Sequence, residues 1–125
     1  MFSVIQTHDA PAAIGPYSQA VVAGDWVFVS GQIGLDPKTG ELKGKDLYTQ
    51  ARQALANLDG ILKAADCRLD QVVSVDVFLA DINDFASFNA IYERFFDLHR
   101  PARAVVAVKD LPKNAIVEIR CIAMR

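Results

Sequence analysis

The chain has 125 residues, of which 52% are hydrophobic, and its formal net charge at pH 7 is −2. This length suits one domain with a substantial core, which we expect to span residues 1–125. The acidic balance argues against a surface that follows nucleic-acid phosphates, and the sequence has neither a segment apolar enough to span a membrane nor an N-terminal leader.

The N-terminal third is predicted to contain a stiff loop followed by two strands. Prolines within residues 10–17 restrict the residues before them, so this segment cannot be a helix. Residues 18–22 and 26–33 are predicted strands joined by a tight turn. One face of the second strand carries Trp26, Phe28 and Ser30, and the other carries Val27, Val29 and Ile33.

Two helices and a strand are predicted in the middle of the chain. The first helix begins near Asp46, whose side chain can cap the first amides. Its apolar residues recur every three or four positions as Leu47, Ala51, Ala54, Leu58, Ile61 and Ala65. Residues 72–80 are a predicted strand, because alternate residues there form two sets that would face opposite sides of a sheet. The second helix begins near Asn83 or Asp84 and must end before Pro101. Its expected buried residues are Phe85, Phe88, Ile91 or Tyr92, and Phe95.

Residues 103–108 and 116–124 complete the predicted strands. Each helix links two strands, which indicates an α+β fold with a mixed sheet and two helices packed on one face. The strands nevertheless carry apolar side chains on both faces. A partner should therefore cover the second face, and a homo-oligomer is expected, although the pattern does not give its symmetry.

Cysteine and histidine spacing predicts no metal site. Cys67 and Cys121 lie far apart, and His8 and His99 have no second ligand at metal-binding spacing. Reduced thiols in a cytoplasmic protein are expected.

Two turns should contain residues with positive φ angles. In the turn at 36–40 proline presets one dihedral angle and Gly40 supplies the positive one. Asn114 follows a proline and a lysine, and asparagine tolerates the left-handed conformation.

Arg103 and Glu118 each interrupt an apolar strand, and these two strands are joined by a short connection. If the strands face each other, the two charges form a polar site. A guanidinium binds a carboxylate through two parallel hydrogen bonds, and a glutamate can transfer protons. The alternative is a cross-strand surface ion pair that contributes roughly 0.2–1 kcal/mol.

Four other residues are candidate site residues. Tyr17 lies on a proline-containing loop for which an ordinary turn is the commoner explanation. Ser30 lacks a histidine in a context that indicates a catalytic triad, so a nucleophilic role is not expected. Gly31 has no side chain and would let a ligand or another backbone approach. Asn89 lies near aromatic residues and faces either solvent or a pocket.

The order of these segments resembles the RidA/YjgF family of reactive enamine and imine deaminases. The matching motifs are APAAIGPYSQ at 10–19, SGQI at 30–33, DPKTG at 36–40, NDF at 83–85, YERFF at 92–96, PAR at 101–103, LP at 111–112 and VEI at 117–119. The resemblance implies a chorismate-mutase-like α+β fold and a homotrimer with three clefts between subunits.

The resemblance also implies an activity. Such proteins hydrolyse 2-aminoacrylate, 2-iminopropanoate and 2-iminobutanoate to 2-oxo acids and ammonia, without a cofactor. Pyridoxal-phosphate-dependent dehydratases supply these substrates. By resemblance, Arg103 binds the substrate carboxylate and Glu118 positions or activates water. Tyr17, Ser30, Gly31 and Asn89 line the cleft.

Arg120 departs from the family pattern, because relatives often carry an acidic residue there. On a strand it shares a face with Glu118, so we expect it to favour the ionised carboxylate.

Two other functions are compatible with the same residues. One is a non-catalytic binding or regulatory module for 2-oxo acids or amino acids. The other is a ribonuclease or translation inhibitor, which is disfavoured because the chain has no paired histidines and no basic stripe.

Overall fold

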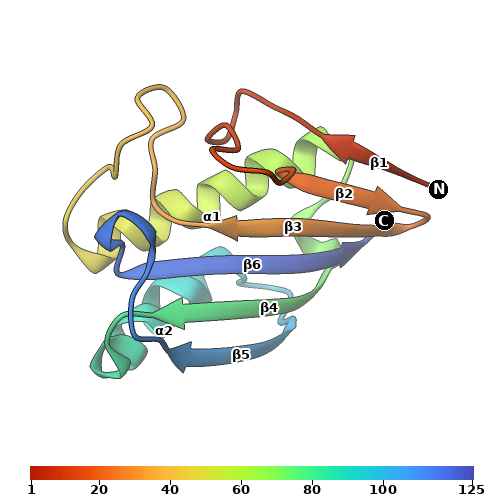
Figure 1. Ribbon diagram of the computed structural model, residues 1–125. Coiled ribbons are helices and arrows are strands. Elements are labelled where there is room, and N and C mark those ends of the chain that lie inside the picture. The colour runs from red at the N-terminus through yellow and green to blue at the C-terminus, as the bar shows by residue number, and fades with distance from the viewer.

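A computed structural model describes residues 1–125, which form one six-stranded sheet with two helices on one face (Figure 1). The strands are β1 (Phe2–Ile5), β2 (Ala20–Ala23), β3 (Trp26–Gln32), β4 (Val72–Leu79), β5 (Ala102–Ala107) and β6 (Val117–Met124). The helices are α1 (Leu47–Ala64) and α2 (Phe85–Phe95). Short 3₁₀ turns lie at Leu69–Gln71, Ile82–Asp84 and Pro112–Asn114.

The strand order across the sheet is β1-β2-β3-β6-β4-β5. Only β4 and β5 pair in parallel, and all other neighbours are antiparallel. Helix α2 connects β4 to β5, and α1 connects β3 to β4, two strands that both run antiparallel to β6. The predicted mixed α+β sheet with crossover helices is therefore confirmed.

The strand order contradicts one expectation. Arg103 lies on β5 and Glu118 on β6, but β4 lies between these two strands. The short connection between β5 and β6 thus passes over one strand and does not form a hairpin. Because β4 occupies the position between them, the two residues do not form the cross-strand pair considered from the sequence.

Helix α1 follows the predicted pattern. Asp46 accepts a hydrogen bond from the Thr49 amide at 3.1 Å, and the predicted apolar stripe is buried except for Leu47, which is half-buried. Helix α2 buries Phe88 and Tyr92, but Phe85 stays 40% exposed, contrary to prediction. Phe85 is the first residue of the helix, and its ring lies near the exposed Arg103 of β5.

The two sheet faces differ as expected. Side chains under the helices are fully buried, among them Val27 and Val29 of β3. On the other face Trp26, Phe28, Val106 and Met124 are 40–47% exposed. No element of this chain covers that face, which lies toward the viewer in Figure 1. None of the helices is long and apolar enough to cross a membrane.

Strand β1 was not predicted. Its four residues pair with β2 at the edge of the sheet, and three of them are exposed. The positive φ angles expected at Gly40 and Asn114 are present, at 74° and 57°.

Candidate active site

An irregularity in β3 builds the wall of the site. Val29 pairs with Cys121 and Gln32 pairs with Ile119, so two residues of β3, Ser30 and Gly31, lie opposite the single residue between those partners on β6. This is the geometry of a β-bulge, which redirects side chains locally. As a result Gln32 is buried under the helices, whereas Ser30 and Gly31 line a cleft with Glu118.

Gly31 and Glu118 are in close contact. A Cβ atom on residue 31 would lie 2.7 Å from Oε2 of Glu118 and 3.0 Å from its carboxyl carbon. Real carbon atoms do not approach so closely, so any larger residue would displace the carboxyl group. The sequence predicted that Gly31 would let a ligand or another backbone approach, whereas the group that approaches it within the chain is the glutamate side chain.

Glu118 is half-buried, and desolvation by burial raises the pKa of its carboxyl group. The expected influence of Arg120 is wrong. Arg120 Nε lies 3.9 Å from Asp76 Oδ2, its cross-strand partner on β4, and does not counteract the burial of Glu118. A carboxyl group with a raised pKa accepts protons more readily near neutral pH, which suits a general base.

The cleft around Glu118 has a volume of about 460 Å³ and is open to solvent. Tyr17, Ser30, Gly31, Pro112 and Arg120 are among the residues that line it. The Ser30 hydroxyl donates a 2.6 Å hydrogen bond to the Ser18 carbonyl oxygen. That hydroxyl proton is therefore engaged by the backbone, and no histidine lines the cleft.

A second hollow, of about 330 Å³, contains Arg103 and Asn89. The Arg103 guanidinium carbon lies 4.6 Å from the Tyr92 ring centroid and 5.9 Å from that of Phe85. Two aromatic faces thus hold the cation, an arrangement available to arginine because its guanidinium is planar. Arg103 forms no ion pair within this chain, so its hydrogen-bond donors are free for an anion.

Two buried polar atoms in this hollow have no hydrogen-bond partner, namely Oδ1 of Asn89 and the Tyr92 hydroxyl. Burial raises the pKa of Tyr92 to about 12, although the charge of Arg103 opposes the shift. Unpaired buried groups are costly, which marks them as groups that a ligand or a partner can satisfy. Asn89 therefore has the pocket position that the sequence left open.

Arg103 and Glu118 lie on opposite faces of the sheet. Arg103 is in register with Val75, which is in register with Cys121, and both partners are buried under the helices. Glu118 is in register with Phe78 on the uncovered face. Neighbours in register point to the same side of a sheet. One chain therefore presents the two groups to different sides and cannot bring both to one small molecule.

Three buried amides, which the sequence interpretation missed, hold the loops around the site. The Gln19 side chain donates to the carbonyl oxygens of Thr7 and Pro11 at 3.1 and 2.8 Å and accepts from the Thr7 amide at 2.7 Å. Gln50 joins Gly44 to Ile116, and Asn57 binds the backbone at residues 33 and 35. A signal existed, because Gln50 and Asn57 belong to the buried stripe of α1 at helical spacing.

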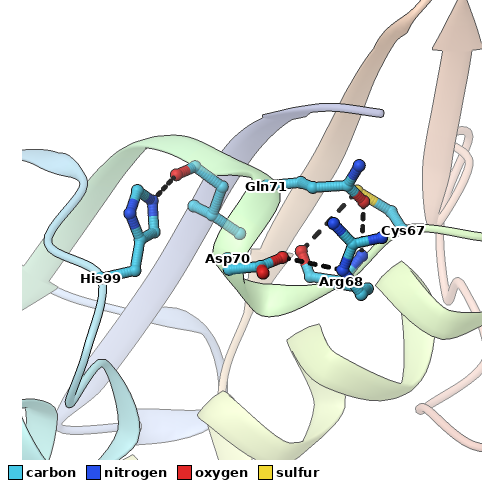
Figure 2. Close-up of polar contacts among 6 residues, drawn as sticks. Cys67, Arg68, Asp70, Gln71 and His99 are labelled. Atoms are coloured by element: carbon cyan, nitrogen blue, oxygen red, sulfur yellow. Dashed lines mark hydrogen bonds and ion pairs between the residues drawn. The ribbon is translucent and has the colours of Figure 1, made fainter.

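His99 anchors a loop, and both cysteines are buried. In Figure 2, His99 donates from Nε2 to the Val72 carbonyl oxygen, and Gln71 Oε1 accepts from the Arg68 amide beside buried Cys67. Burial raises the pKa of both cysteines, to about 12 for Cys121. No three histidine, cysteine, aspartate or glutamate residues lie close enough to share a metal ion.

Comparison with known proteins gives consistent matches. The family model described as Endoribonuclease L-PSP matches residues 7–125. A RutC family protein of Pyrococcus horikoshii is 48% identical over 125 residues, covering 100% of this chain and 99% of the relative. The 2-iminobutanoate/2-iminopropanoate deaminase of Homo sapiens is 48% identical over 122 residues, covering 98% of this chain and 89% of the human protein.

Solved structures agree closely with this fold. The YjgF gene product of E. coli superimposes with a TM-score of 0.94 at 48% identity, covering 98% of both chains. E. coli TdcF with bound serine gives a TM-score of 0.94 at 44% identity, again covering 98% of both chains. The family resemblance read from the sequence and the fold that it implied are thereby confirmed.

Proposed function

We propose that this chain, which belongs to the endoribonuclease L-PSP family, also known as RidA/YjgF, is a hydrolytic deaminase of small 2-enamine and 2-imino acids. Relatives that are 48–51% identical carry the name 2-iminobutanoate/2-iminopropanoate deaminase. The structural observation that carries the proposal is Glu118, half-buried with a raised pKa and held against Gly31 in an open cleft.

The reaction needs one proton carrier and one anchor. Water adds its oxygen to the imine carbon, the C–N bond then breaks, and the products are a 2-oxo acid and ammonia. Glu118 takes a proton from the attacking water and returns one to the leaving nitrogen, so no net proton is consumed by the side chain. Because an iminium carbon is already electrophilic, orientation supplies much of the remaining acceleration.

Arg103 binds the substrate carboxylate in this proposal. Its guanidinium has no acidic partner in the chain and is held over Tyr92 and Phe85. Two parallel N–H donors match the two oxygens of a carboxylate. Tyr17, Ser30 and Gly31 line the cleft on the Glu118 side, and Asn89 lines it on the Arg103 side, where its free Oδ1 can accept a hydrogen bond from the substrate nitrogen.

The complete site requires two copies of the chain, since Arg103 and Glu118 face opposite sides of one sheet. A homotrimer with three such clefts is the assembly that we propose. The uncovered face of the sheet, with exposed Phe28 and Val106, supports it because monomers rarely leave such an apolar surface exposed. Each cleft would then receive the arginine of one copy and the glutamate of the next.

The cellular setting follows from the substrate. The chain would act as one domain in the cytoplasm, where dehydratases that depend on pyridoxal phosphate release enamines, and it would bind no nucleic acid. Free buried cysteines and a core to which the strands and both helices contribute support this setting.

The first experiment couples a serine or threonine dehydratase to the purified protein and follows imine disappearance. Wild type should accelerate the loss of imine, and Arg103→Ala should not. Arg68→Ala is a matched control, because Arg68 is an exposed arginine that lines neither hollow. If a folded, oligomeric wild type gives no acceleration, the deaminase proposal is wrong.

A binding module is the second candidate, favoured by the serine bound in the structure of E. coli TdcF. Both candidates lose carboxylate binding in Arg103→Ala. The deaminase alone predicts that Glu118→Gln abolishes turnover while calorimetry still detects 2-oxo acid binding. Turnover that survives in Glu118→Gln would instead contradict the assigned role of the glutamate.

A further inference from the structure

Arg120 lies in the cleft but has no role in the proposed reaction. It lines the same cleft as Glu118 and follows it by two residues on β6. Side chains two positions apart on a strand share a face and are about 7 Å apart along it. Arg120 is therefore separated from Glu118, the residue that would activate water, by about the length of a short carbon chain.

The guanidinium of Arg120 is only weakly engaged within the chain. Its only ion-pair partner is Asp76, with Nε and Oδ2 3.9 Å apart, and both side chains are nearly half exposed. This separation is longer than a hydrogen bond. Exposed pairs of this kind contribute little to stability, so a ligand carboxylate can replace Asp76 at little cost.

Small residues line the cleft beside Arg120, because Ser30 and Gly31 of the β3 bulge lie opposite it. Val21 and Phe28 add apolar surface on the side of Arg120 away from Glu118, since Phe28 is in register with Val21 and with Ile122. A substrate anchored at its 2-carboxylate by the other copy's arginine, with its reacting carbon at Glu118, would extend its side chain along the small residues toward Arg120.

We infer that Arg120 is a specificity residue that selects 2-imino acids bearing a second carboxylate on the side chain. The inference rests on the proposed deaminase function and identifies its preferred substrate class. Arg120 binds the distal carboxylate through its planar donors, and this carboxylate replaces the loosely placed Asp76. The class comprises the imino forms of four- and five-carbon amino dicarboxylic acids.

The test compares two imines on the same enzyme. Amino acid oxidases generate the imine of alanine and the imine of aspartate or glutamate, and deamination is measured as kcat/KM for each. Arg120→Gln should lower kcat/KM for the dicarboxylic imine at least roughly tenfold, as expected for loss of a charge-assisted hydrogen bond, and change the alanine imine less than about twofold. Arg120→Lys should recover part of the loss.

Two further variants sharpen the result. Asp76→Asn should raise the dicarboxylic preference, because it removes the competing carboxylate. Arg68→Gln breaks a similar exposed ion pair, with Asp70, outside the cleft and should leave the ratio unchanged. If Arg120→Gln leaves the ratio of the two kcat/KM values unchanged, as an equal loss for both imines would, the inference is overturned. A wild type that hydrolyses neither imine would instead refute the deaminase proposal and the inference with it.

Discussion

Gly31 and Glu118 pack so closely that one added methyl group on residue 31 would change the site. The bulge in β3 turns residue 31 toward β6, and the absent side chain leaves room for the carboxyl group. This contact explains why a glycine occurs inside a strand, where it usually weakens the structure. It also keeps Glu118 partly out of water, which raises the pKa of its carboxyl group.

Gly31→Ala should abolish most imine hydrolysis, because the new Cβ would lie 2.7 Å from Oε2 of Glu118. The carboxyl group is the end of a flexible side chain and can shift aside, so the stability cost should be below the roughly 1–3 kcal/mol typical of overpacking. The stability cost, measured by urea unfolding, should largely disappear when the same change is made in Glu118→Ala. An equal cost in both backgrounds would show that the strain arises from the backbone and not from this contact.

Glu118→Gln should stabilise the protein at pH 8. Burial raises the carboxyl pKa above its ordinary value of 4.5, so the folded state binds the proton more tightly than the unfolded state does. The ionised group therefore opposes folding as the pH rises through the raised pKa. The stability gained by the substitution should vanish as the pH falls below 4.5.

Thermal unfolding at one protein concentration and several pH values measures this difference. Glu41→Gln, on an exposed turn, is the control and should show no comparable change with pH. A Glu118→Gln variant that is less stable than wild type at pH 8 would contradict the role of burial.

At the scale of elements, local patterns predicted most of the fold. Alternation separated Val27 and Val29 from Trp26 and Phe28, and the three-and-four spacing of α1 identified its buried face. Two features of the fold could not be predicted from local sequence pattern. Insertion of β4 between β5 and β6 depends on long-range pairing, and the bulge that buries Gln32 depends on its partner strand.

The sequence likewise predicted the residues of the candidate site but not their placement. Arg103 and Glu118 are visible in the sequence because each charge interrupts an apolar strand. Their placement on opposite faces is not visible, because the register between strands is set by the whole sheet. The free oxygens of Asn89 and Tyr92 appear only when the helix is packed against the sheet.

The loop that carries Tyr17 is held by one buried side chain, Gln19. Gln19→Met keeps the shape of the side chain but leaves the backbone groups of Thr7 and Pro11 without partners. Each buried polar group left unpaired costs about 1–3 kcal/mol, so the unfolding free energy should fall by at least that much.

Hydrogen exchange should show faster exchange of the Thr7 amide in Gln19→Met, since its acceptor is lost. Gln6→Met is the matched control, because Gln6 is exposed and makes no side-chain hydrogen bond. If both variants exchange alike, Gln19 does not hold the loop.

At the scale of the whole molecule, the unequal faces of the sheet connect assembly with activity. One face is covered by α1 and α2, and the other leaves large apolar side chains exposed beside the Glu118 cleft. Association through the uncovered face would remove this apolar surface from water. In this account the same association brings an Arg103 to each Glu118, so oligomer formation and activity depend on each other.

Mixed oligomers test that account most directly. Arg103→Ala and Glu118→Gln, each inactive alone, are unfolded together, refolded at equal amounts and assayed for imine hydrolysis. If each site takes its arginine from one copy and its glutamate from another, random mixing should restore about a quarter of the wild-type activity. If both residues act within one chain, the mixture should remain as inactive as the separate variants, and the shared site would be wrong.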